Sequence, residues 1–115
     1  MKVRIHNYTW IGDQVQIGDG SKIQAFAFIP NGVTIGKNVF IGPSVTFTND
    51  MYPRAKGNWS PLKTVVEDGA SIGANATILC GVRIGKNAMI GAGSVVIKDV
   101  FDGETVVGNP ARRIK

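Results

Sequence analysis

One stretch of the chain, residues 48–64, concentrates side chains that could hold a charged ligand. Its two aromatic rings, Tyr52 and Trp59, offer flat apolar surface. The same stretch carries three cations, at Arg54, Lys56 and Lys63. Cations of this kind attract an anionic substrate. We therefore interpret residues 48–64 as a functional segment, the alternative being that its aromatic side chains dock it on a neighbouring subunit.

The elements on either side of this stretch are built from a six-residue repeat. Twelve of the thirteen isoleucines fall on one of two registers with this spacing. The repeat is marked by Ile5, Ile11, Ile17, Ile23, Ile29, Ile35 and Ile41, and then by Ile72, Ile78, Ile84 and Ile90. A fixed short period indicates a solenoid, in which each repeat is one structural unit.

Each repeat is expected to form one short strand and one corner, because six residues match neither a flat strand nor a helix. Glycine directly follows the isoleucine in seven repeats, and glycine tolerates a cramped corner. A small or β-branched residue lies four positions after each isoleucine, so both positions should face inward. A second period of eighteen aligns Trp10 with Phe28, which indicates three repeats per triangular turn. We predict an all-β parallel solenoid of about five turns, stacked roughly 4.8 Å apart.

The repeat is interrupted once. Phe47 and Val66 are nineteen positions apart where one repeat needs six, so thirteen residues are inserted. The isoleucine register resumes in phase after them, which predicts a loop near residues 48–65 protruding from an unbroken solenoid. Two prolines and a glycine keep the insertion out of the strand ladder. Solenoids often carry function on such loops.

The remaining composition indicates one domain, 1–115, that stays in the cytoplasm. No apolar run approaches about 18 residues and no secretory leader is visible, which argues against a membrane and against export. The single cysteine, Cys80, excludes an internal disulfide and is expected to be structural.

The net charge of +5 does not point to nucleic acid, because the basic residues are scattered and no groove-reading element is visible. The exception is a terminal cluster of Arg112, Arg113 and Lys115. This cluster suits a small polyphosphate, or it is a solvated tail.

The repeat resembles the left-handed parallel β-helix of the hexapeptide-repeat acyltransferases. The likeness sharpens in residues 47–55 (Phe-Thr-Asn-Asp-Met-Tyr-Pro-Arg-Ala), 69–78 and 107–114 (Val-Gly-Asn-Pro-Ala-Arg-Arg-Ile). From about Ser21 to Ile114 the chain looks like the bacterial N-acetyltransferases that acylate amino groups of nucleotide-linked sugars for surface polysaccharide. The left hand follows from the resemblance alone, because generic crossover chirality favours a right-handed coil.

This resemblance implies acetyl-CoA as co-substrate, a nucleotide-linked deoxy amino sugar as acceptor and no metal. Many members of the wider superfamily place a histidine near the loop as general base, whereas the only histidine here, His6, lies more than two turns below Asn49. A sugar amine needs less help from a base than a hydroxyl does. We therefore expect direct attack of the amine on the thioester, with Asn49 orienting the nitrogen and Asp50 as the candidate proton acceptor.

The resemblance also implies further site residues. CoA would run parallel to the rod, past the backbone of Ala74 and Ala92 and toward the chain end. The implied CoA-binding residues are Ala74, Ala92, Lys98, Pro110, Arg112 and Arg113. The implied substrate-binding residues are Gln24, Tyr52, Arg54 and Lys63, although Gln24 could instead belong to an internal hydrogen-bonding row. Relatives assemble as homotrimers with clefts between parallel rods, which an outward stripe of Trp10 and Phe28 would suit.

Four other interpretations bear on the same repeat. A γ-type carbonic anhydrase shares the fold but needs three histidine ligands, which this chain lacks. Ice-binding rods need long threonine arrays, and the exposed positions here are mixed. O-acetylation of a sugar hydroxyl and a non-catalytic trimeric solenoid module stay open as alternatives.

Overall fold

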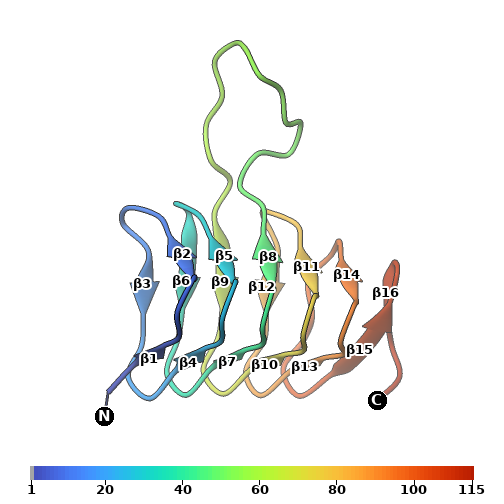
Figure 1. Cartoon of the computed structure of the whole chain (residues 1–115). Helices are drawn as coiled ribbons and strands as arrows, with labels where there is room; N and C mark the ends of the chain where they lie inside the picture. Colours follow the sequence, from blue (N-terminus) through green and yellow to red (C-terminus); the bar gives the residue numbers. More distant parts are fainter. Residues whose placement is uncertain (1) are drawn as a thin grey trace.

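The computed structural model describes residues 2–115 as a triangular rod of parallel strands (Figure 1). Three sheets form its faces. Sheet A contains β1 (Arg4–Ile5), β4 (Lys22–Ile23), β7 (Phe40–Ile41), β10 (Ser71–Ile72), β13 (Met89–Ile90), β15 (Thr105–Gly108) and β16 (Ala111–Arg113). Sheet B contains β2 (Trp10–Ile11), β5 (Phe28–Ile29), β8 (Thr46–Phe47), β11 (Thr77–Ile78) and β14 (Val95–Val96). Sheet C contains β3 (Gln16–Ile17), β6 (Val33–Ile35), β9 (Thr64–Val66) and β12 (Arg83–Ile84).

The chain passes through sheets A, B and C in turn, so that each three strands complete one turn of the coil. The predicted all-β solenoid of about five turns is confirmed. Strand β15 pairs in parallel with β13 and begins a sixth turn, because residues 91–104 complete one more circuit after Ile90. Residues 2–115 form no helix, and hence none that could span a membrane.

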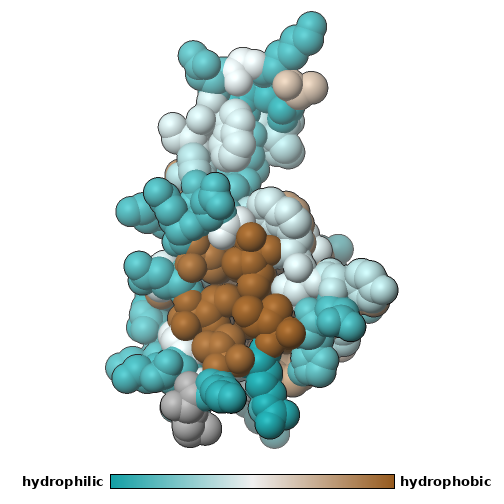
Figure 2. Space-filling view, turned by 60° about the vertical axis from the view of Figure 1, so that its left-hand side comes forward, coloured by the Kyte–Doolittle hydropathy of each residue, from teal (hydrophilic) through white to brown (hydrophobic). Residues whose placement is uncertain are grey.

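The interior is a column of aliphatic side chains. The repeated isoleucines from Ile23 to Ile90 are buried, and Phe47 and Val66 take the isoleucine position on either side of the insertion. The small residues four positions after each isoleucine are buried from Ser21 onward, so the predicted inward pair of positions is confirmed over most of the rod. At the N-terminal end the core side chains reach the surface, and Ile5 is 49% exposed there (Figure 2).

Each corner has two positions that favour glycine or asparagine, for different reasons. Residues three positions after the core residue adopt a left-handed backbone, as Asn38, Asn75 and Gly69 do. Glycine directly after the core residue is required by the next turn, because a Cβ on Gly73 would lie 2.7 Å from the Ala92 nitrogen. The glycine directly after the core residue therefore sets how closely the turns stack. The left-handed residue two positions later turns the chain toward the next sheet.

The insertion leaves the rod after β8 and returns into β9, projecting well away from the sheets (Figure 1). At its base the Leu62 N–H donates to the Asn49 carbonyl at 2.9 Å. Thr64 pairs with Val33 and Val66 with Ile35, so the solenoid resumes in register. The predicted loop on an unbroken coil is confirmed.

Candidate functional site

Residues two positions after each core residue of sheet B stack at the corner between sheets B and C, which we call the B–C corner. Asp13, Asn31 and Asn49 occupy this position in the first three turns, each eighteen residues after the last. The Asn49 Nδ2 donates to the Asn31 carbonyl at 3.0 Å. The Asn49 Oδ1 forms no hydrogen bond within residues 2–115 and is left to accept one from a ligand.

A cleft of about 540 Å³ lies beside this column, which we call the Asn49 cleft. It is lined by Trp10, Ile11, Gly12, Asp13, Phe28, Pro30, Asn31, Asn49 and Trp59. The rings of Trp10 and Phe28 are stacked with centroids 4.9 Å apart and face outward from sheet B, as predicted. Trp59 comes from the protruding loop, so the loop supplies part of the cleft.

Asp50 and Arg54 are paired with each other inside the loop. The Arg54 Nη1 lies 3.1 Å from the Asp50 carboxylate, and the Tyr52 N–H donates to the same carboxylate at 3.1 Å. Arg54 also donates to the carbonyls of Tyr52 and Asn58. These two side chains thus hold the loop in shape, while the side chains of Tyr52 and Lys63 are exposed on it.

The predicted CoA-binding alanines lie at a different corner, between sheets A and B. Ala74 and Ala92 occupy it in the fourth and fifth turns. No hydrogen bond found among residues 2–115 uses the amide nitrogen of either alanine. Ala74 is half-buried and Ala92 is exposed, and Gly73 and Gly91 beside them add no side chain. The backbone here fits the predicted contact with the amide groups of an extended pantetheine arm.

The A–B corner continues into the hairpin of β15 and β16. The Gly108 N–H donates to Ser94 Oγ at 3.1 Å, and a Cβ on Gly91 would lie 2.5 Å from Val107 Cγ1. Pro110, in the loop that joins β15 to β16, therefore lies one level above Ala92 along the rod. Gln24 and His6 lie at the same corner in the second and first turns, below Ala74.

The two terminal arginines point to opposite faces of this hairpin, because neighbouring residues of a strand alternate. Arg113 pairs with the inward residue Val106, and its Nε lies 3.5 Å from Glu104. Arg112 pairs with Val107, on the face that packs over the A–B corner. Of the two arginines, Arg112 is therefore the one on the side of the alanine column.

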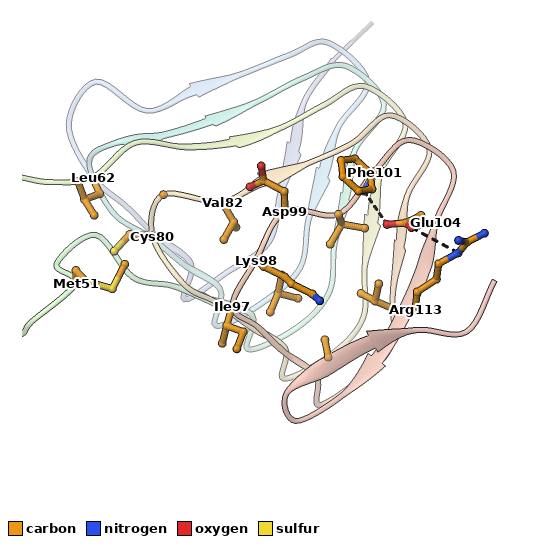
Figure 3. A pocket seen from close by; sticks show the side chains of 15 residues that line it. Met51, Leu62, Cys80, Val82, Ile97, Lys98, Asp99, Phe101, Glu104 and Arg113 are labelled. Atoms are coloured by element: carbon orange, nitrogen blue, oxygen red, sulfur yellow. Dashed lines mark hydrogen bonds and ion pairs between the residues drawn. The ribbon is translucent and has the colours of Figure 1, made fainter.

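Lys98 lies away from the alanines, on the B–C corner in the fifth turn. It points into a cleft of about 860 Å³ at the C-terminal end of the rod, which we call the end cleft (Figure 3). Arg113, Glu104 and Phe101 line the same cleft. Cys80 is buried in its wall, where the Cys80 N–H donates to Thr48 Oγ1 at 2.9 Å.

A single chain does not bring the predicted catalytic and CoA-binding residues together. Asn49 follows sheet B, whereas Ala74 and Ala92 precede it, so the full width of that sheet separates them. Asp13 and Asn31 were not predicted from the sequence. Asn31 lies eighteen and Asp13 thirty-six residues before Asn49, and this period is the signal that would have found them.

Comparison with known proteins identifies the class. The model of the bacterial transferase hexapeptide (six repeats) family matches residues 14–49 and 63–98. The chain therefore belongs to this family, and it is an acyltransferase with the left-handed parallel β-helix fold. The predictions of family, fold and enzyme class are confirmed. No curated protein sequence matches the chain significantly.

Solved structures agree with this assignment. A hexapeptide-repeat acetyltransferase from Vibrio cholerae, also solved with acetyl-coenzyme A, is 30% identical with a TM-score of 0.83, over 98% of this chain and 69% of its own. A maltose O-acetyltransferase from Clostridium difficile 630 is 27% identical with a TM-score of 0.86, over 99% and 66%. The perosamine N-acetyltransferase from Caulobacter crescentus, solved as a mutant with CoA and GDP-perosamine, is 23% identical with a TM-score of 0.74, over 98% and 53%, which shows the fold alone.

The pairing of Asp50 with Arg54 predicts that Asp50→Asn loosens the loop. Because the ion pair is partly exposed, its loss should raise the rate of tryptic cleavage after Lys56 roughly two- to fivefold. Limited proteolysis followed by mass spectrometry measures this rate. Glu67→Gln, which removes the Glu67–Arg83 ion pair outside the loop, is the matched control. Equal cleavage of Asp50→Asn and the parent protein would show that the pair does not order the loop.

Proposed function

We propose that the protein transfers the acetyl group of acetyl-CoA to the amino group of a nucleotide-linked deoxy amino sugar. The observation that carries this proposal is the Asn49 column, which offers a free carbonyl oxygen and no imidazole beside the loop. The only histidine, His6, lies at another corner in the first turn. A hydroxyl acceptor needs a base to remove its proton as it attacks, whereas a neutral amine does not.

The proposal requires a trimer, which the outward residues of sheet B favour. These residues are Trp10, Phe28, Thr46, Thr77 and Val95. None is charged, whereas sheet A presents Arg4 and Lys22 and sheet C presents Arg83. Three parallel rods with sheet B facing a threefold axis bury this uncharged face.

Such a trimer completes the site. When sheet B faces the axis, the B–C corner of one chain meets the A–B corner of the next. Asn49 of one subunit then faces the alanine column of its neighbour. CoA would occupy that column from the level of Ala74 upward, with its adenosine phosphates near Pro110 and Arg112. The Vibrio cholerae relative was solved with acetyl-coenzyme A, which supports the choice of donor.

In the proposed reaction the Asn49 Oδ1 accepts an N–H of the acceptor amine and directs its lone pair at the thioester carbonyl. The new C–N bond forms a tetrahedral intermediate, whose oxyanion backbone N–H groups of the adjoining turn would stabilise. The C–S bond then breaks, the thiolate leaves as CoA, and the amine loses a proton to that sulfur or to water. Asp50 is a second candidate for this proton, provided that its ion pair with Arg54 opens.

The proposal extends to the setting of the reaction. It places the enzyme in the cytoplasm, where acetyl-CoA and activated sugars are available, and in surface polysaccharide synthesis. The alternative acceptor is a sugar hydroxyl, as the maltose O-acetyltransferase at 27% identity illustrates.

The acceptor is tested by release of free CoA thiol from acetyl-CoA against nucleotide-linked amino sugars and the matching hydroxy sugars. We expect turnover with an amine alone, and Asn49→Ala should lower kcat roughly 100-fold because the nitrogen is no longer oriented. Its KM for acetyl-CoA should stay unchanged. Asn58→Ala, on the same loop, is the control. Turnover with hydroxy sugars would move the assignment to O-acetylation, and full activity of Asn49→Ala would remove Asn49 from the mechanism.

The two faces of the terminal hairpin give a paired prediction. Arg112→Ala should raise the KM for acetyl-CoA roughly tenfold, because a charge-assisted hydrogen bond to phosphate is lost. Arg113→Ala should leave this KM unchanged, since Arg113 faces Glu104 and the end cleft. Steady-state kinetics with varied acetyl-CoA measures both. Equal effects of the two substitutions would contradict the assignment of faces.

A further inference from the structure

The positions along the rod separate two binding regions. Asn49 belongs to the third turn, and the alanine column with Pro110 occupies the fourth turn and those above it. Asp13 and Asn31 belong to the first and second turns. If the proposed function holds, the donor uses the upper turns, and the acceptor must reach Asn49 from the lower ones. The Asn49 cleft is the cavity that lies there.

The walls of the Asn49 cleft suit a sugar ring. Trp10 and Phe28 form one stacked aromatic surface on the rod, and Trp59 lines the cleft from the loop. Trp10 is 54% and Trp59 is 47% exposed in the single chain, and in the proposed trimer the side of Trp10 that lines the Asn49 cleft stays open. An aromatic face is the negative side of the ring and attracts the C–H groups on the face of a sugar.

Asp13 is the acidic residue of this cleft. Its side chain forms no hydrogen bond or ion pair within residues 2–115, unlike Asp50, Asp68 and Asp102. Replacing it by asparagine therefore removes no hydrogen bond or ion pair seen among residues 2–115. An unpaired carboxylate at the edge of an aromatic cleft is well suited to accept hydrogen bonds from sugar hydroxyls.

Asp13 and Asn49 belong to the same column, two turns or about 9.6 Å apart along the rod at the ladder spacing. Both side chains therefore lie at the B–C corner on the side from which the acceptor would arrive.

We infer that the Asn49 cleft is the acceptor-sugar subsite, in which the sugar ring lies between the tryptophans and Asp13 binds a ring hydroxyl. The inference rests on the proposed function for the direction from which the acceptor arrives. In the proposed trimer Gln24 of the neighbouring chain would face this cleft. The nucleotide then extends outside the cleft, and its phosphates stay away from the Asp13 carboxylate.

The two tryptophans of the chain both line this cleft, so intrinsic fluorescence reports binding without turnover. The probes are nucleoside-diphosphate sugars carrying the amine at C2, C3 or C4, together with the matching hydroxy sugars. We expect saturable change in emission with at least one probe. Trp10→Phe and Trp59→Phe each should remove part of the change. A protein whose emission responds to none of these probes would overturn the inference.

Asp13→Asn tests the specific contact. In the Asp13→Asn variant the Kd for the responding probe should rise roughly ten- to hundredfold, and the KM for acetyl-CoA should not change. Asp19→Asn, in the same first turn but at the corner after sheet C, should leave the Kd unaltered. An unchanged Kd for Asp13→Asn would overturn the role of Asp13.

These outcomes are separable from those of the proposed function. If acetyl transfer goes to a hydroxyl while Asp13→Asn still weakens sugar binding, the subsite stands and the amine reaction fails. If an amine is acetylated while neither the tryptophans nor Asp13 affect acceptor binding, the subsite fails and the reaction stands.

Discussion

The structure depends on one constraint, the close stacking of successive turns eighteen residues apart. Buried isoleucines fill the interior, and glycine at the first corner position lets the next turn approach, as Gly73 does beneath Ala92. Parallel pairing then places every residue directly above its counterpart in the previous turn. Side chains for chemistry are consequently arranged in columns, and their position along the rod follows the period of eighteen, except across the insertion between Ile41 and Ile72 and in the shorter last turn from Ile90 to Val106.

The same constraint explains how much the sequence predicts. The period of six predicts the sheets and the core, and the period of eighteen predicts the outward stripe of Trp10 and Phe28. The period does not predict side-chain pairs that form outside the repeated coil. Asp50 and Arg54 bind each other within the loop, where no repeat sets the geometry. Arg112 and Arg113 separate because the chain end folds back as an antiparallel hairpin, which reverses the parallel pattern.

The division of labour between corners follows from the triangular section. Asn49 lies after sheet B and the alanine column before it, so neither corner is a complete site. A threefold arrangement around sheet B would join them and would also place the sugar cleft below and the CoA column above the reacting atoms. The uncharged outward face of sheet B, the alanine amides of the A–B corner and the unpaired Asp13 are then parts of one arrangement.

The most direct test of this account is the solution mass measured by sedimentation equilibrium, with activity assayed on the same sample. The account predicts a particle of three chains, about three times 12.2 kDa, that Thr77→Arg on sheet B dissociates with loss of activity. Thr34→Arg on sheet C should keep both the mass and the activity. A 12.2 kDa monomer with full acetyl transfer would contradict the claim that two chains form the site.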